Sequence, residues 1–265
     1  MTRQHRTALI TGASAGIGAA FARHLAAEGY DLLLVARRAE RLQALAAELA
    51  AAHGVRVEVF AADLNNPAAP ASIIGFAEQQ GIAIDVLINN AGLSGKTAFA
   101  DTPWPTLAAE IQLMVTAVTE LCHRVLPGMR TRGWGRIVNL SSLAAFSPPG
   151  ASLLYTGIKR YVLDISQSLD MELKPQGIHV TALCPGFTRS EFHDTMGTRD
   201  AADKLPGILW QEADEVVREG WAAVMKGKPV CVPGVVNKLV AGSVRPLPVA
   251  LQYQLGKRLN PFSEQ

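Results

Sequence analysis

Tyr155 and Lys159 are the pair of residues in this sequence best suited to proton chemistry. The segment from Tyr155 to Met171 has a helical pattern, so the two side chains are expected one turn apart on the same helix face. A tyrosine loses its proton near pH ~10 and is a weak acid-base catalyst at neutral pH. A fixed ammonium beside it favours the phenolate, so we expect the pKa of Tyr155 to fall toward the working range. The spacing predicts an acid-base pair whose ammonium can also donate to ribose hydroxyls.

Ser142 is a third candidate, because it follows a short apolar run and precedes Tyr155 by 13 residues. That length of loop is enough to bring both side chains to the same edge of a sheet. A serine hydroxyl there can hold a substrate oxygen while Tyr155 supplies the proton. The alternative is that Ser142 only caps a helix or closes a turn.

A glycine-rich turn near the start of the chain has the features of a phosphate site. The apolar run 7–11 leads into Thr-Gly-Ala-Ser-Ala-Gly-Ile-Gly and then into a helical pattern that ends near Glu28. Glycines let the backbone approach a pyrophosphate, and the helix start offers free N–H groups and a positive dipole end. An ordinary tight connection is the alternative. The turn predicts that a dinucleotide is bound by Gly12, Ser14, Gly16, Ile17 and Gly18.

Arg37 and Arg38 follow the second apolar run, where a dinucleotide site for NAD(H) carries an acidic residue instead. A carboxylate would repel a 2′-phosphate, whereas a guanidinium pairs with it through two parallel hydrogen bonds. The two arginines therefore predict NADP(H) as the cofactor. The alternative is that they are solvated side chains at a helix start.

The elements that must position these residues form an alternating pattern of short apolar runs and longer helical stretches. Such alternation predicts an α/β fold, a doubly wound Rossmann-type parallel sheet with helices on both faces, in one domain over 1–265. The carboxyl ends of the strands then share one edge, where ligands bind. The expected strands are Thr7–Thr11, Asp31–Ala36, Val55–Phe60, Asp85–Ile88, Arg136–Leu140 and Ile178–Leu183, and Ala39–Ala52 is one of the expected helices.

Two segments fall outside this pattern. Residues 187–210 are polar and irregular and follow a strand end, so they are a candidate substrate lid or an exposed connection. Residues 230–265 form an apolar C-terminal extension that can cover an apolar substrate, pack on its own domain or a second subunit, or rest on a membrane interface.

Composition excludes several other classes of protein. The net charge of +2 gives no sustained attraction to nucleic acid. The three cysteines are isolated, which fits a reduced chain, and neither they nor the six histidines have the spacing of a metal site. We expect no transmembrane segment, since no apolar run is long enough, and no secretion signal, since the first residues are polar. The expected location is the cytoplasm.

Together these motifs resemble the short-chain dehydrogenase/reductase family in its shorter, single-domain form, over about residues 7–230. Three further segments carry the resemblance. The family contacts adenine at the position of Asp63 and Leu64, and it supports the sheet and the adenosine ribose with Asn89-Asn90-Ala91-Gly92. It meets the nicotinamide carboxamide with the segment that matches Pro185-Gly186-Phe187-Thr188.

The resemblance implies hydride transfer at nicotinamide C4, with a small-molecule carbonyl or secondary alcohol as substrate. Ser142 would position the carbonyl, Tyr155 would act as acid or base, and Lys159 would orient the ribose and tune Tyr155. The spacing of Tyr155 and Lys159 argues against the enoyl-reductase branch. Expected cofactor contacts on these grounds include Asp63, Leu64, Asn90, Ala91, Tyr155, Lys159 and Thr188. An apolar substrate is our further expectation.

One position departs from the family pattern. The family places an asparagine in the predicted helix Glu110–Arg130, where it holds a water in the proton relay behind the lysine, and this chain has Met114. A thioether is a weak acceptor and cannot donate. Three alternatives follow from Met114. Either another group serves the relay, or activity is lower, or the protein binds cofactor with weak or no catalysis.

The resemblance also implies a homodimer or homotetramer formed through two long helices, here predicted as Glu110–Arg130 and Ser152–Lys174.

Overall fold

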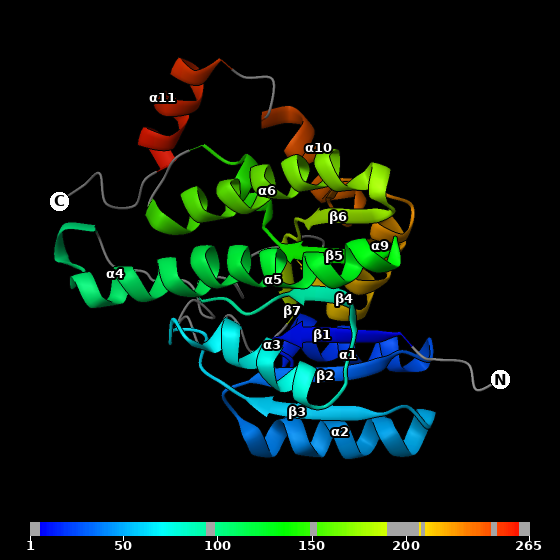
Figure 1. Ribbon diagram of the computed structural model, residues 1–265. Helices are drawn as coiled ribbons and strands as arrows, with labels where there is room; N and C mark the ends of the chain where they lie inside the picture. The colour runs from blue at the N-terminus through cyan, green and yellow to red at the C-terminus, as the bar shows by residue number, and fades with distance from the viewer. Residues whose placement is uncertain are drawn as a thin grey trace.

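The computed structural model describes residues 6–93, 99–148, 153–189, 207, 210–244 and 248–259. Within this part of the chain, a seven-stranded sheet is covered by helices on both faces (Figure 1). The doubly wound α/β fold predicted from the alternating pattern is thereby confirmed.

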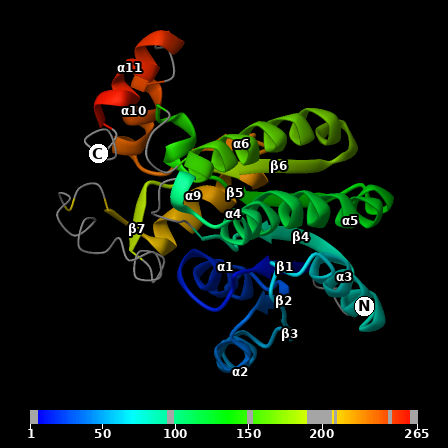
Figure 2. The ribbon, with the colours of Figure 1, turned by 90° about the vertical axis from the view of Figure 1, so that its left-hand side faces the viewer.

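The strand order of the sheet is β3-β2-β1-β4-β5-β6-β9, and every neighbouring pair in it is parallel. The order reverses between β1 and β4, so the chain leaves a crevice at their carboxyl ends, which is where sheets of this kind bind ligands. Figure 2 looks at the molecule from the side toward which the strands of Figure 1 point. The strands of the sheet are β1 Thr7–Thr11, β2 Asp31–Ala36, β3 Val57–Ala61, β4 Ile84–Asn89, β5 Gly135–Leu140, β6 Ile178–Leu183 and β9 Val230–Cys231.

Strands β1, β2 and β6 have the predicted bounds, whereas β3, β4 and β5 differ from them by one or two residues. Strand β9 was not predicted. It has only two residues, Val230 and Cys231, which pair with Ala182 and Leu183. The apolar C-terminal extension therefore begins inside the main sheet.

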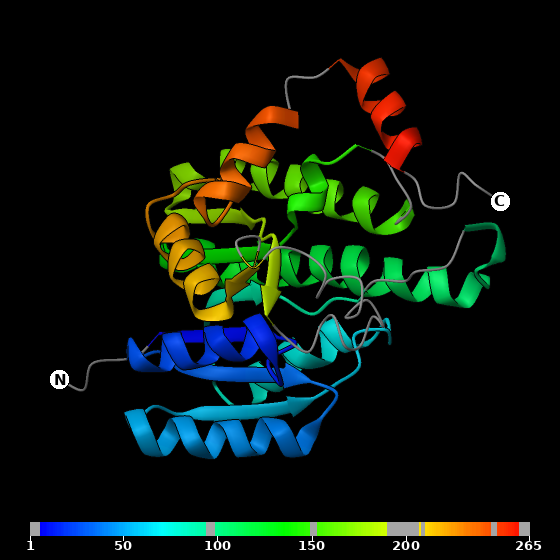
Figure 3. The same ribbon diagram turned by 180° about the vertical axis from the view of Figure 1, so that it is seen from behind.

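Alternate residues of each strand face opposite helical layers. Leu9 lies in a core with α3, α5 and α6, while its neighbours Ala8 and Ile10 lie in a core with α1, α2 and α9. Each fully buried leucine of this kind contributes about 1.5–3 kcal/mol of hydrophobic stabilisation. Figure 3 shows α1, α2 and α9 on the far face. The α-helices are α1 Gly16–Ala27, α2 Ala39–His53, α3 Ala69–Gln79, α4 Trp104–Ile111, α5 Ala117–Arg132, α6 Leu153–Leu173, α9 Ala213–Met225, α10 Val235–Val244 and α11 Val249–Leu259.

The helix predicted over Glu110–Arg130 is interrupted. Helix α4 passes into a π-helical turn, Gln112–Thr116, before α5 begins, and Met114 lies within that turn. Such π turns occur mostly as single turns inside α-helices, frequently at functional sites. Short 3₁₀ turns complete the helical elements at Phe99–Asp101, Leu143–Phe146 and Lys174–Gln176.

A small two-stranded sheet lies beside the carboxyl edge of the main sheet. Strand β7, Phe187–Arg189, pairs in parallel with β8, Trp210–Glu212. These strands contain the two ends of the predicted lid 187–210, whose residues 190–206 and 208–209 lie outside the described residues. No helix among the described residues is long and apolar enough to cross a membrane.

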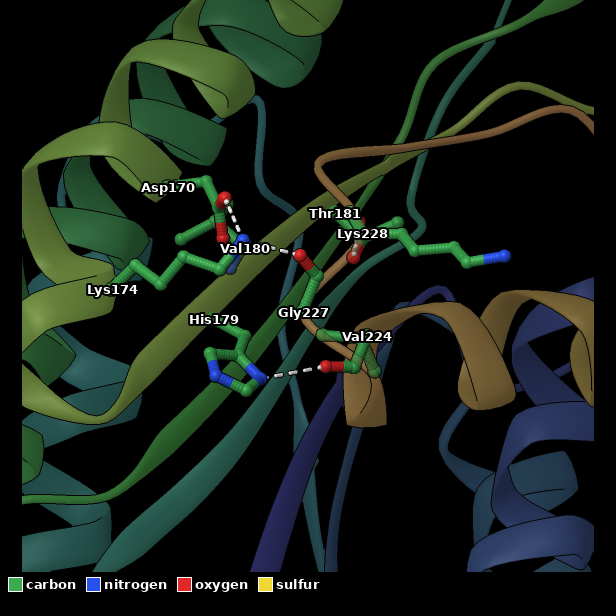
Figure 4. A network of polar contacts seen from close by, with 8 residues as sticks. All are labelled: Asp170, Lys174, His179, Val180, Thr181, Val224, Gly227 and Lys228. Atoms are coloured by element: carbon green, nitrogen blue, oxygen red, sulfur yellow. Dashed lines mark hydrogen bonds and ion pairs between the residues drawn. The ribbon is translucent and has the colours of Figure 1, made fainter.

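A polar network joins three elements at the amino-terminal end of β6, far along the strand from its carboxyl edge (Figure 4). The Asp170 carboxylate of α6 accepts from the Val180 N–H and pairs with Lys174, which also donates to the Gly227 carbonyl. The His179 ring bonds the Val224 carbonyl at 3.0 Å. The network fixes β6 between α6 and the α9–β9 connection.

Candidate active site

The glycine turn follows β1 and is closed by Asn90, the residue that follows β4. The Asn90 amide nitrogen donates to the carbonyl oxygens of Thr11 (3.0 Å) and Gly12 (3.2 Å). Gly12 has φ +65°, and a Cβ there would lie 2.7 Å from that nitrogen, so a side chain at this position is excluded. The Asn90 side chain, predicted to contact the cofactor, is therefore used by the turn itself.

Helix α1 begins in this turn at Gly16 and presents an uncapped amino terminus. Its N-cap residue, Ala15, makes no side-chain capping hydrogen bond. The first N–H groups of the helix therefore have no cap and can bind an anion at the positive end of the dipole. A pyrophosphate fits this arrangement, with Gly12, Gly16, Ile17 and Gly18 forming the turn around it.

Arg38, at the N-cap of α2, reaches across to Ser14 in the glycine turn. Its guanidinium donates from Nε (3.2 Å) and Nη2 (3.0 Å) to the Ser14 hydroxyl. Both side chains lie at the surface, and Arg37 is exposed next to them. The structure thus places Arg38, one of the two arginines predicted to meet a 2′-phosphate, in contact with the predicted phosphate turn.

The other predicted cofactor residues lie along the same edge. Asp63 is exposed and accepts from the Asn65 N–H, while Leu64 is buried in the core. The Ala91 N–H donates to the Thr11 hydroxyl. Thr188 is buried in β7 and its hydroxyl donates to the Gly186 carbonyl (3.2 Å).

Ser142 and Tyr155 meet at the carboxyl end of β5. The Ser142 side chain caps the 3₁₀ turn that follows it, since its oxygen accepts from the Ala144 N–H at 3.1 Å. It also forms a side-chain hydrogen bond with Tyr155, which lowers the phenol's pKa. The Ser142 hydroxyl therefore has the capping role considered as an alternative and also contacts Tyr155.

Lys159 is buried, with 6% of its surface exposed, and reciprocal hydrogen bonds join it to the end of β5. Its Nζ donates to the Leu140 carbonyl (2.8 Å), and the Ser141 hydroxyl donates to the Lys159 carbonyl (2.7 Å). Burial lowers the pKa of Lys159 to about 8, and the nearby Cys184 thiol opposes that shift. At neutral pH the group is therefore mostly an ammonium.

The pKa of Tyr155 is shifted in the direction opposite to the one expected from the sequence. Burial raises it above the ordinary value, and the Ser142 hydrogen bond only partly offsets this. The Lys159 ammonium lies 5.4 Å from the centre of the phenol ring and donates to the Leu140 carbonyl. In this arrangement the loss of water around the phenolate outweighs the attraction of the ammonium.

Met114 lies close to the catalytic lysine. A Cβ placed on Gly92 would be 3.5 Å from the Met114 sulfur and 3.9 Å from the Lys159 Nζ, so both of these groups lie against Gly92. Met114 is itself buried. Met114, the residue that departs from the family pattern, therefore lies near the Lys159 ammonium.

Ser141 and Asn139 were not predicted to serve the site. Asn139 in β5 accepts from the Asn89 amide (2.9 Å) and donates to Ser166 of α6 (3.0 Å), which ties β4, β5 and α6 together beneath the catalytic residues. A polar residue inside an otherwise apolar strand was the signal available in the sequence. The described residues contain no group of three or more histidine, cysteine or carboxylate side chains that could hold a metal ion.

Comparisons with known proteins agree with this site. The family model for short chain dehydrogenases matches residues 6–201. Serine 3-dehydrogenase from Agrobacterium fabrum is 37% identical over 218 residues, which are 79% of this chain and 84% of that protein. A solved short-chain dehydrogenase from Sphingobium yanoikuyae in complex with NADPH is 36% identical, with a TM-score of 0.80 over 92% of this chain and 97% of that one.

A second solved structure, the bulky-bulky ketone specific alcohol dehydrogenase from Comamonas testosteroni, is 30% identical. Its TM-score is 0.77, and the match covers 94% of this chain and 97% of that one. With the phosphate turn, the Ser142–Tyr155–Lys159 cluster and these matches in agreement, the chain belongs to the short-chain dehydrogenase/reductase family of oxidoreductases.

Proposed function

We propose that this protein transfers a hydride between NADP(H) and a carbonyl or secondary-alcohol carbon of an apolar small molecule. The observation that carries the proposal is the meeting of Ser142, Tyr155 and buried Lys159 at one strand edge, beside the turn in which Ser14 contacts Arg38. A proton donor, a hydroxyl that can hold a substrate oxygen and a cation are what carbonyl reduction requires of the protein.

Each side chain has a definite task in this proposal. When bound, NADPH would supply the hydride for the carbonyl carbon. Tyr155 donates its phenolic proton to the carbonyl oxygen during reduction and accepts it back during oxidation. Ser142 accepts from the Ala144 N–H, which leaves its own hydrogen free to donate to the substrate oxygen or to Tyr155. Lys159 provides the positive charge that favours the phenolate when the proton has left.

The cofactor would be held along the same edge. The Gly12–Gly18 turn and the start of α1 would hold the pyrophosphate. The 2′-phosphate would be bound by Arg37, Arg38 and Ser14. Asp63, Leu64 and Ala91 would contact the adenosine end, and Thr188 the nicotinamide amide. The preference for NADP(H) is supported by the Arg38–Ser14 contact and by NADPH in the similar solved structure.

An apolar substrate is supported by the side chains that follow β6. Phe187 is 40% exposed, and its ring packs against Trp210 with centroids 5.8 Å apart. Phe187 belongs to the segment 185–188 assigned to nicotinamide, and Trp210 is its partner on the neighbouring strand β8. The name of the Comamonas testosteroni enzyme also specifies a bulky ketone as its substrate class.

The test is NADPH oxidation, followed by absorbance, with a panel of ketones graded from small to bulky. We expect turnover that increases with apolar bulk, is faster with NADPH than with NADH, and is lost in Tyr155→Phe. Turnover on small polar carbonyls alone would contradict the substrate class, and equal rates with both cofactors would contradict the cofactor.

A second candidate function rests on Met114, which lies beside Lys159 in place of the relay asparagine. In this alternative the protein binds NADPH with weak or no catalysis. Fluorescence titration of NADPH alongside the ketone panel separates the two. Tight binding with no turnover of any ketone or alcohol supports the alternative.

We further propose that the protein works in the cytoplasm as a homodimer or homotetramer formed through α4–α5 and α6. Light scattering on the purified protein tests the assembly, and a monomeric mass would contradict it.

A further inference from the structure

Arg160 is the residue after Lys159 on α6, and it reaches the loop that follows Ser142. Its Nε donates to the Ala145 carbonyl (2.9 Å) and its Nη2 to the Ser147 carbonyl (2.8 Å). Helix α6 also carries Tyr155. Two neighbouring residues of one helix, Lys159 and Arg160, are therefore bonded to two ends of the same segment, because Lys159 donates to the Leu140 carbonyl.

The loop that Arg160 holds is the one that fixes the Ser142 hydroxyl. Ser142 accepts from the Ala144 N–H at 3.1 Å, and the Ala145 N–H donates to the Ser142 carbonyl at 3.0 Å. These bonds lie within one 3₁₀ turn, so they shape the turn without fixing its distance from α6. The bonds from Arg160 connect the Ala145 and Ser147 carbonyls of this loop to α6, in addition to the contact of Ser142 with Tyr155.

Apolar packing supports this turn on one side only, where Ala145 lies in a small core with Leu163 of α6. Beside it a surface pocket of about 190 Å³ separates the turn from α6, bordered by Ala145, Phe146, Arg160 and Leu163. Arginine suits such a place, because its planar guanidinium donates in two directions at once and loses little freedom in doing so.

We propose that Arg160 is a positioning residue, which holds the turn after Ser142 against α6 and so keeps the Ser142 hydroxyl at Tyr155. Arg160 does not touch the reacting atoms. The inference rests on the proposed function, since it assigns a role in the same carbonyl chemistry.

The test is a double-mutant cycle on kcat with Ser142→Ala and Arg160→Met. We expect Arg160→Met to lower kcat about 10- to 100-fold, as a misplaced catalytic group does, while the NADPH Kd stays within about twofold of wild type. In the Ser142→Ala background the same change should cost less than about twofold, since no hydroxyl remains to be positioned. Equal costs of Arg160→Met in both backgrounds would overturn the proposal.

The pH profile and a conservative variant separate positioning from a general loss of structure. Losing the Ser142 hydrogen bond raises the pKa of Tyr155, so Arg160→Met and Ser142→Ala should shift the pH dependence of kcat in the same alkaline direction. Arg160→Lys keeps one donor and should recover part of kcat. The matched control is Arg124→Met on α5, where an arginine pairs with Glu120 at the surface, and we expect it to leave kcat and the pH profile unchanged.

Hydrogen exchange provides a readout that needs no substrate. The Ala144 amide should exchange faster in Arg160→Met than in wild type or Arg124→Met, and unchanged exchange would overturn the proposal. If the wild-type protein turned over no carbonyl, the proposed function would fail and this inference with it. If Ser142→Ala lowered kcat and Arg160→Met left it unchanged, only this inference would fail.

Discussion

Arg38→Leu is expected to weaken NADPH binding selectively. The guanidinium is held in place by two donations to the Ser14 hydroxyl, at 3.2 and 3.0 Å, so it is already oriented at the phosphate turn before a ligand arrives. Hydrogen bonds to a charged group contribute about 1.5–3 kcal/mol each, and exposure of the pair to solvent reduces that. We therefore expect a loss near the lower limit of this range.

A loss of about 1.4 kcal/mol corresponds to a tenfold rise in Kd. Arg38→Leu should raise the Kd of NADPH about tenfold and leave that of NADH within about twofold, because NADH has no 2′-phosphate. Ser14→Ala should raise the NADPH Kd by a smaller factor, since it removes the acceptor that orients Arg38 and keeps the charge. Fluorescence titrations of both variants with both nucleotides provide the four constants.

The reasoning would be refuted by either of two results. An NADPH Kd that does not change in Arg38→Leu would show that the guanidinium does not meet the phosphate. An equal rise for NADPH and NADH would show that Arg38 supports the turn itself and does not select the cofactor. Raised salt should weaken NADPH binding to wild type more than to Arg38→Leu, which checks that the lost interaction is electrostatic.

Three further predictions follow from the site and the sheet. Met114→Asn should preserve or raise turnover, and a large loss of activity would show that the methionine is no defect. Burial lowers the pKa of Lys159 to about 8, so kcat/KM should decline as pH rises through that value, because the ammonium is lost; a flat profile to high pH would contradict this. Burial and the charges of Arg136 and Lys174 lower the pKa of His179 from 6.5, while a bond to Val224 and the Asp170 carboxylate oppose this. Just below pH 6.5 the unfolded state then binds more protons than the folded state, so the free energy of unfolding should decrease as pH is lowered through this range, and urea unfolding of His179→Gln should show a weaker pH dependence.

The apolar runs in the sequence predicted six of the seven strands of the main sheet. The bounds of β1, β2 and β6 could be predicted because apolar runs of five or six residues end at clear turn signals. Strand β9 could not be predicted, since a two-residue strand has no periodicity. It forms because Val230 and Cys231 pair with Ala182 and Leu183 at the edge of β6. The π turn around Met114 was not predicted for a related reason, because a single π turn inside a longer helical stretch is too short to show a periodicity of its own.

The site was predictable in its residue types and less so in its electrostatics. Spacing alone brought Ser142, Tyr155 and Lys159 together, yet it gave the wrong direction for the pKa of Tyr155, because burial depends on the whole fold. The contacts of Arg160 could not be predicted from the sequence either, since they join its side chain to backbone carbonyl groups 13 and 15 residues away in the chain. Backbone acceptors leave no trace in the sequence.

The most direct test of the central claim is single-turnover hydride transfer in Tyr155→Phe, with NADPH bound and a ketone that the wild-type protein reduces. The account predicts that this variant binds NADPH normally and transfers hydride at least about 100-fold more slowly, since general acid catalysis contributes a factor of this order or more. Hydride transfer at the wild-type rate would contradict it, because the proton would then come from another group.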